Sequence, residues 1–255
     1  MDLEPAERNP AELRRTAFTL IAIMIVGAAF VLYAYKKHEQ SSDPNRPPIT
    51  AKITRNLATK NQQDEFASMS TFEGKVWFAA PFCISQLDEN KHAIAAMKEL
   101  DARYKDRKDV HFVLLSIEGV DQGVTPVQLA EAAQQLDIDN SRWSLLTSND
   151  TNKQRGYIKD QLRLGLVSER LPGDPKGKWK FPSQISLIDR EMHVRQRYDF
   201  KQATEAQAEM EKNVAKHPEL KEEENIDLYL RAVPLLREKM FANTDYVLNE
   251  TSTGK

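Results

Sequence analysis

The feature that most limits the fold is a run of twenty residues without a charge, Thr16 to Tyr35, near the start of the chain. The run is rich in Ile, Val, Ala, Leu and Phe, and as a helix rising ~1.5 Å per residue it would be ~30 Å long. That length matches the hydrocarbon core of a bilayer, so we expect a single transmembrane helix over residues 16–35. Tyr33 and Tyr35, followed by Lys36 and Lys37, form a border typical of a membrane interface. A cleaved signal peptide is the alternative, but its apolar region would be shorter and followed by a small-residue cleavage site.

The sequence divides into five segments, of which this helix is the second. We expect an N-terminal tail (1–15), the membrane helix (16–35), a linker and domain entry (36–71), a soluble α/β domain (72–200) and a charged helical extension with a tail (201–255). Residues 41–48 are polar and rich in proline, a composition that suits a spacer between membrane and domain. Basic residues flank the apolar run on both sides in nearly equal number, so charge alone does not decide its orientation.

Composition excludes several classes of function. Thirty-six basic against 38 acidic side chains leave a formal charge of −2, so the excess of cations that binds nucleic-acid phosphates is absent. The sequence has one cysteine, Cys83. A disulfide within the chain, a Cys-x-x-Cys redox pair and a metal site made of cysteines alone are therefore all excluded.

The first half of the soluble segment alternates between strand and helix. Apolar runs predict buried strands at Val76–Phe82 and Val110–Ile117. A helix from Glu89 to Tyr104, with Asp88 as its N-cap, is predicted between them, and another runs from Thr125-Pro126 to Leu136. Strands and helices in this order predict parallel strands joined by right-handed crossovers.

The second half predicts a third helix, a hairpin and a terminal helix. The third helix spans Asp150 to Leu162, and the strands Ile185–Ile188 and Val194–Tyr198 flank a turn at residues 189–193. Residues 201–224 are rich in Ala, Glu, Gln and Lys, which is typical of a solvated helix and loop. Helical spacing returns from Ile226 to Met240 and predicts a terminal helix on the sheet, with Pro234 either kinking it or marking its start.

The order of these elements is that of the thioredoxin-like fold, and short motifs narrow the resemblance. The motifs are Gly74-Lys75-Val76-Trp77-Phe78-Ala79-Ala80, the helix with Met97, Val113-Leu114-Leu115-Ser116-Ile117, Thr125-Pro126, Trp143-Ser144-Leu145-Leu146-Thr147, Leu187-Ile188-Asp189 and Tyr198-Asp199. From about Phe72 to Phe200 the chain resembles the Sco/SenC family, with peroxiredoxin-like and other thioredoxin-fold proteins as alternatives. The resemblance implies a membrane-anchored protein that helps to deliver copper to cytochrome c oxidase. It also implies a soluble domain on the outer face of the cytoplasmic membrane, or in the intermembrane space of a mitochondrion.

The copper ligands of that family are missing from this sequence. The family binds copper through two cysteines with three residues between them, after the first core strand, and through one histidine before the hairpin. The resemblance places Gln86 and Asn90 at the cysteine positions and Phe181 at the histidine position. Thiolate and imidazole suit copper, whereas an amide does not replace a thiolate. We therefore expect no resident metal or cofactor, and neither copper(I) capture nor thiol–disulfide exchange by the family's route.

Substitute ligands are few in the sequence. Glu89 and His92 share a helix face, and Met192 with His193 falls in the hairpin turn, where we expect solvent exposure. Cys83 is interpreted as a small buried hydrophobe, with a mixed disulfide to a partner as the alternative.

Two further features lie just before the hairpin. Phe181-Pro182 precedes a strand, which is the position of a cis-proline in thioredoxin-like proteins; the sequence leaves the isomer of Pro182 open. Lys176, Lys178 and Lys180 alternate with Gly177, Trp179 and Phe181. That alternation predicts either a twisted hairpin with solvated lysines or a docking surface for an acidic partner or lipid headgroups.

The leading hypothesis is a membrane-anchored accessory or scaffold protein, not an enzyme, in the assembly of a respiratory oxidase. Its partners would be oxidase subunits or assembly factors. One alternative is a copper carrier that uses His92 or Met192. Another is a thioredoxin-fold oxidoreductase or peroxidase that relies on the single thiol of Cys83.

Overall fold

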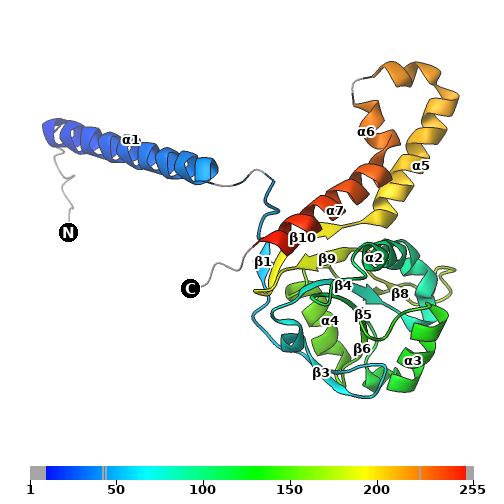
Figure 1. The fold of residues 1–255 in the computed structure, drawn as a ribbon. Helices are drawn as coiled ribbons and strands as arrows, with labels where there is room; N and C mark the ends of the chain where they lie inside the picture. Colours follow the sequence, from blue (N-terminus) through cyan, green and yellow to red (C-terminus); the bar gives the residue numbers. More distant parts are fainter. Residues whose placement is uncertain (1–9, 42, 44, 224, 251–255) are drawn as a thin grey trace, which may run out of the picture. The chain divides into compact units, whose positions relative to one another are not determined.

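The computed structural model describes residues 10–41, 43, 45–223 and 225–250, and the chain divides into two compact units, residues 1–46 and 47–255. The first unit contains one long helix, α1 (Pro10–Ser41), which includes the whole predicted segment 16–35 (Figure 1). Its part Arg14–Tyr33 has a mean hydropathy of 2.3 and buries no residue. Among the described residues, α1 is the one helix long and apolar enough to cross a membrane.

A mixed sheet of six strands organises the second unit, in the order β1-β10-β9-β4-β5-β6 (Figure 1). The strands β4 (Val76–Phe82), β5 (Val110–Ser116) and β6 (Trp143–Leu146) run parallel, as the alternation of elements predicts. The strands β9 (Ile185–Ile188) and β10 (His193–Tyr198) form the predicted antiparallel hairpin, and β9 pairs with β4. The short edge strand β1 (Ala51–Lys52) pairs with β10.

Every residue of β4 is buried because helices cover both faces of the sheet. Successive side chains of a strand point to opposite faces. Phe78 and Phe82 therefore join one core, with α2 (Lys91–Arg103), α3 (Pro126–Gln135) and α7 (Ala232–Asn249), whereas Trp77 joins the other core with α4 (Thr151–Asp160). This two-sided burial explains why β4 reads as a continuous apolar run and not as an alternating one.

Two of the helices begin where their sequences predict. Thr125 forms a capping box with Gln128: its hydroxyl accepts from the Gln128 N–H, and the Gln128 side chain accepts from the Thr125 N–H at 3.0 Å. The carboxylate of Asp150 accepts from the Lys153 N–H at 3.0 Å at the start of α4.

The start of α2 was predicted wrongly. Residues Ile84–Asn90 form a 3-10 segment, η2, and α2 begins at Lys91 with Asn90, not Asp88, at its N-cap. Gln86 adopts φ −141° and ψ 46°, which is not helical and interrupts the turn. A contact with a distant part of the chain, described below, holds Gln86 in that conformation.

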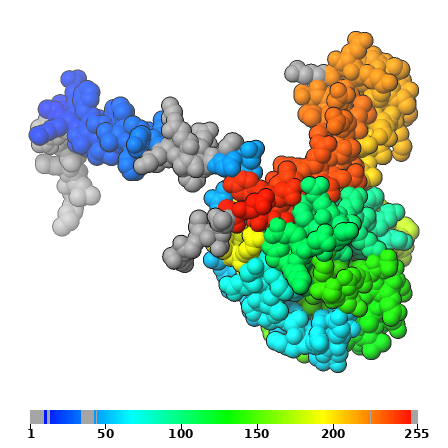
Figure 2. Space-filling view, in the orientation of Figure 1, coloured from blue at the N-terminus to red at the C-terminus, as the bar shows by residue number. Residues whose placement is uncertain are grey.

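The C-terminal region forms an arm that extends away from the sheet (Figures 1 and 2). The helix α5 (Phe200–Lys216) runs outward, the 3-10 segment η4 (Pro218–Glu222) and α6 (Ile226–Leu230) reverse the chain, and α7 returns to the sheet. We call residues 200–231 the arm. Pro234 is the third residue of α7, so it marks the start of that helix and does not kink it.

The entry to the domain contributes more structure than a linker. The strands β2 (Ala58–Lys60) and β3 (Phe66–Ser68) form a small hairpin, followed by the 3-10 turn η1 (Met69–Phe72). A second small pair, β7 (Ser168–Glu169) with β8 (Trp179–Lys180), lies outside the main sheet. The sequence pattern did not predict the bounds of these four short strands, because it shows mainly turn residues and polar residues there.

Candidate functional site

Gln86, the first of the predicted ligand positions, lies in η2, and its side-chain amide bonds to a distant backbone segment. Its nitrogen donates to the carbonyl of Lys176 at 2.7 Å and to the carbonyl of Trp179 at 3.0 Å. Its oxygen accepts from the Trp179 N–H at 2.7 Å. One primary amide thus satisfies three backbone groups of residues 176–179, which lead into β8, and joins that segment to η2.

The backbone of residues 176–179 lies directly against Gln86. Gly177 has φ +88°, a conformation that glycine adopts at low cost. A Cβ atom added at Gly177 would lie 2.6 Å from Cδ of Gln86. Gly177 therefore meets two requirements at once, the positive φ and the close approach of the backbone to the amide.

Asn90 and Phe181, the other two predicted ligand positions, are also occupied by contacts within the protein. Asn90 is fully buried, and its amide nitrogen donates to the carbonyl of Pro81. Its Oδ1 has no partner within the described part of the chain. Phe181 is partly buried and packs against the core that contains Trp77 and Trp179.

Cys83 follows β4 and is fully buried, as predicted. Its sulfur lies 3.2 Å from the hydroxyl of Ser85 and 3.4 Å from a carboxylate oxygen of Glu118. Burial raises the pKa of the thiol to about 11, and the charge of Glu118 acts in the same direction. A thiol in this state is protonated at neutral pH, which disfavours reactions that need the thiolate.

Glu118 connects Cys83 to Trp179. The second carboxylate oxygen accepts from the indole N–H of Trp179 at 2.6 Å. Arg155 of α4 covers the ring of Trp179, with its guanidinium carbon 4.0 Å from the ring centroid, and its Nε donates to the carbonyl of Ile117 at 2.8 Å. Contacts within the domain thus join Cys83, Glu118, Trp179 and Arg155 in one cluster.

Sequence reasoning missed Glu118 and Arg155. The available signal was the position of Glu118, two residues after Ser116, which ends the buried strand β5. Polar side chains after parallel strands gather at one edge of a sheet, which is where Cys83 lies. Nothing in the local pattern around Arg155 marks its contact with the indole of Trp179.

The substitute ligands do not come together. The carboxylate of Glu89 pairs with Lys201 at 2.8 Å and with Arg170 at 3.5 Å, so its partners are these two cations and not the imidazole of His92. Burial opposes ionisation of Glu89, but these two cations hold its pKa below the usual value. Among the described residues, no group of three or more His, Cys, Asp or Glu side chains could hold a metal ion.

Met192 was expected in an exposed turn, and this expectation is wrong. The side chain is 8% exposed and belongs to the core that contains Trp77. Its backbone has φ +65°, and its carbonyl accepts from the N–H of Ile53 at 2.9 Å, so the domain entry covers the turn. His193 begins β10, where its Nδ1 lies 3.2 Å from the carboxylate of Asp189.

The alternating lysines do not form an aromatic surface patch. Lys176, Lys178 and Lys180 are exposed, but Trp179 is 1% exposed because its indole is drawn inward by Glu118. The described residues contain no cis peptide bond, so the bond before Pro182 is trans. The hairpin interpretation of the lysines is confirmed by the pairing of β7 with β8.

Comparison with known proteins places this architecture. No family model matches the sequence, and no curated protein matches it. The structure is similar to that of a SCO1/SenC family lipoprotein from Bacillus anthracis str. Ames, with 24% identity over 59% of this chain and 86% of that chain, and a TM-score of 0.50. It is also similar to BsSco, described as a member of the Sco family of cytochrome c oxidase assembly proteins, with 17% identity over 60% of this chain and 86% of that chain, and a TM-score of 0.51.

The chain has the Sco-type thioredoxin-like fold. The fold class expected from the motifs is thereby confirmed, including the apolar N-terminal helix and the C-terminal helices. At these identities the similarity concerns the fold alone. Whether the Sco-type site is present depends on the residues that this chain has at positions 86, 90 and 181. In this chain, those residues are an amide tied to a backbone segment, a buried asparagine and an aromatic ring.

Proposed function

We propose that this protein is a membrane-anchored member of the Sco/SenC group that acts as an accessory or scaffold in the assembly of a respiratory oxidase, without copper at the site of its relatives. The Sco-type fold supports the group, and α1 supports the anchor. The single cysteine supports the loss of the thiolate pair. The protein binds and positions partners, and catalyses no reaction.

The observation that carries the proposal is the engagement of Gln86. Its amide holds three backbone groups of residues 176–179, so the position expected to present a copper ligand is used to close the neighbouring segment. A thiolate accepts hydrogen bonds but donates none, so it does not satisfy the carbonyls of Lys176 and Trp179. The residue present is matched to closure of the loop and not to metal binding.

The placement of the domain in the cell belongs to the same proposal. We place α1 in the membrane and residues 47–255 on the outer face of the cytoplasmic membrane, or in the intermembrane space. Oxidase subunits or assembly factors are the proposed partners, by analogy with the relative described as a cytochrome c oxidase assembly protein. Fusion of alkaline phosphatase, which is active outside the cytoplasm, to residue 250 tests the orientation. An inactive fusion would contradict it.

Copper(I) titration of the full chain in detergent tests the site. We expect no stoichiometric, tight binding when copper(I) competes with a chromophoric chelator. The matched control is the triple variant Gln86→Cys, Asn90→Cys and Phe181→His, which installs the Sco-type ligands and is expected to bind one copper(I). Tight binding by the unaltered chain would overturn the degenerate-site proposal, and absence of binding by the triple variant would overturn the register.

The assembly role needs a separate readout. We expect cells that lack this protein to contain less assembled oxidase, measured by the haem absorbance of purified membranes. The chain itself and its Cys83→Ala variant should both restore the level, since the thiol has no role in this proposal. Unchanged oxidase in the deletion strain would refute the assembly role, and failure of Cys83→Ala alone would favour the thiol-dependent alternative.

A further inference from the structure

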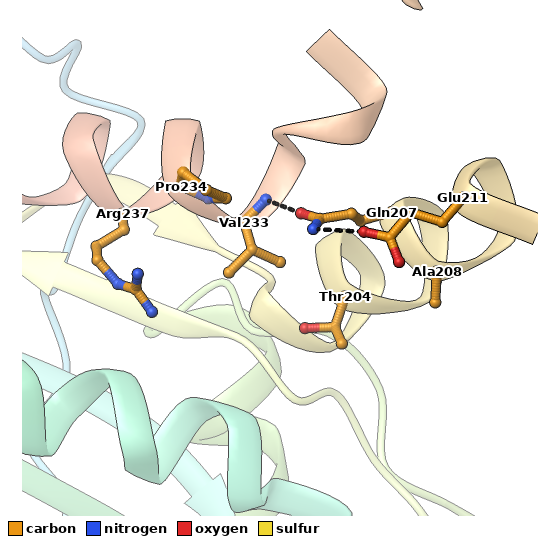
Figure 3. A pocket seen from close by; sticks show the side chains of 7 residues that line it. All are labelled: Thr204, Gln207, Ala208, Glu211, Val233, Pro234 and Arg237. Carbon is orange, nitrogen blue, oxygen red and sulfur yellow. Dashed lines mark hydrogen bonds between the residues drawn. The ribbon is translucent and has the colours of Figure 1, made fainter. Parts of the chain in front are cut away.

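An open groove lies between α5 of the arm and the start of α7 (Figure 3). Its volume is about 370 Å³, and its lining residues are Thr204, Gln207, Ala208, Glu211, Val233, Pro234 and Arg237. Gln207 crosses between the helices, since its oxygen accepts from the N–H of Val233 at 3.1 Å and its nitrogen donates to Glu211 at 3.0 Å (Figure 3). Ala208, Val233 and Pro234 supply the apolar part of the lining.

The two charged residues of the groove are not equivalent. Arg237 pairs with Glu99 of α2 at 2.6 Å, so its charge is already compensated within the domain. Glu211 accepts a hydrogen bond from Gln207 and has no ion pair among the residues that the structure describes. Glu211 lies farther along α5 from the sheet than Thr204, so the uncompensated negative charge is at the outer end of the groove.

The tip of the arm, residues 217–231, carries two exposed apolar side chains. Leu228 and Tyr229 of α6 are 55% and 53% exposed, and the groove residue Val233 follows Tyr229 by four positions. Single exposed apolar residues are common, but two large adjacent ones on a five-residue helix form an apolar centre that solvent does not favour. Exposed acidic side chains surround them in the chain: Glu219, Glu222, Glu223 and Asp227.

Charge decides what kind of partner this surface fits. Residues 200–216 contain three acidic and three basic side chains, whereas residues 217–231 contain five acidic and two basic ones. The excess negative charge of the arm therefore lies entirely in its outer part, around the apolar centre. An anionic membrane surface would be repelled, so the complement is a positively charged protein segment.

We propose that the tip and groove of the arm bind a basic polypeptide segment that presents an apolar side chain. Leu228 and Tyr229 contact the apolar side chain. The lysine or arginine side chains around it bind to Glu211 and to the acidic residues of the tip, Glu219, Glu222, Glu223 and Asp227. An apolar anchor inside a ring of polar contacts is the usual arrangement of residues that dominate protein–protein affinity. This surface stands apart from the Sco-type site and does not depend on the proposed role in oxidase assembly.

Fluorescence anisotropy with a defined probe tests the proposal on the full chain in neutral detergent. The probe is a labelled 16-residue helical peptide of lysine and alanine with two leucines on one face, and its counterpart carries glutamate in place of lysine. We expect the lysine peptide to bind and the glutamate peptide not to bind, with affinity that falls as salt is raised. No binding of the lysine peptide, or equal binding of both peptides, would overturn the proposal.

Matched variants separate the arm from the net charge of the chain. Glu222→Lys with Glu223→Lys should weaken binding at least tenfold, whereas Asp106→Lys with Glu131→Lys, which changes the net charge equally at exposed sites elsewhere, should leave it within twofold. Leu228→Ser with Tyr229→Ser should also weaken binding tenfold, against Phe66→Ser with Val127→Ser as the exposed apolar control. Equal effects of the arm and control pairs would refute the arm as the binding surface. Circular dichroism of each variant verifies that it is folded, which we expect because all eight side chains are exposed.

Discussion

Removal of the Arg195 side chain should destabilise the domain without touching the proposed sites. It lies on β10, its side chain is 1% exposed, and it ties three distant segments together. Its Nη1 donates to Asp189 at 2.9 Å and to Glu250 at 2.8 Å, and its Nε donates to the carbonyl of Pro47 at 3.0 Å. The first residue of the second unit, the hairpin turn and the end of α7 thus share one guanidinium.

The variant Arg195→Met keeps most of the side-chain volume and removes all three hydrogen bonds. Removing one member of a buried ion pair costs ~3–5 kcal/mol because the other charge is left without compensation. Asp189 would keep the N–H groups of Glu191 and His193, both at 2.9 Å, and Glu250 is 22% exposed, so water reaches it. We therefore expect a loss near the lower limit, about 3 kcal/mol.

Thermal unfolding of the full chain in detergent, followed by circular dichroism, measures this loss. For a folded unit of this size each kcal/mol lowers Tm by ~2–4 °C, so Arg195→Met should lower Tm by roughly 6–12 °C. Arg197→Met is the matched control on the same strand, because Arg197 is exposed and donates to the carbonyl of Arg163 at 2.7 Å. That control should lower Tm by less than about 2 °C. Equal shifts for the two variants would show that the buried guanidinium does not hold these segments together.

Three other predictions concern His111, Cys83 and Gln86. Burial, with the charges of Lys75 and Arg142, lowers the pKa of His111 from 6.5 to about 4. Between these two values the unfolded chain binds a proton at this residue that the folded chain does not. The stability of the fold should therefore fall as the pH drops from 6.5 to about 4. His111→Phe, which keeps an aromatic ring beside Phe72, should therefore show a flatter dependence of Tm on pH between 7 and 5, and parallel curves would contradict this. The raised pKa of the Cys83 thiol, about 11 against 9.0, lowers the thiolate fraction at pH 8 by about 100-fold. Native protein should therefore react with a thiol reagent at least about 100-fold more slowly than protein in denaturant, and comparable rates would mean an open thiol. Gln86→Ala removes three hydrogen bonds to residues 176–179, so it should speed trypsin cleavage at Lys176 and Lys178 several-fold. Gln63→Ala, at an exposed position, is the neutral control. Unchanged cleavage of Gln86→Ala would show that the amide does not hold the segment.

Elements that depend on local signals could be predicted closely. The strand β4 was predicted to the residue because its seven apolar residues are buried on both faces. The starts of α3 and α4 follow from Thr125 and Asp150, whose caps involve residues three positions away. The fold class followed from the order of such elements, and the similarity to Sco structures confirms it.

Features that depend on distant contacts were beyond local pattern. Met192 is buried because the domain entry, about 140 residues earlier in the chain, pairs with its carbonyl through Ile53. Trp179 turns inward because Glu118 accepts its indole N–H. A sequence window contains neither partner, so both side chains read as exposed turn or patch residues.

The helix start shows the same limit with a functional meaning. Asp88 is a residue type that favours the N-cap, but α2 begins after Asn90. The amides of Gln86 and Asn90, just before the helix, bond to Trp179 and Pro81. These are the two positions that the resemblance assigns to the copper thiolates. Their amides supply N–H donors to backbone carbonyls, which thiolates lack. At Gln86 and Asn90, closing the loop and binding copper therefore require opposite chemistry, so copper affinity regained with cysteines there should come with a loosened segment 176–179.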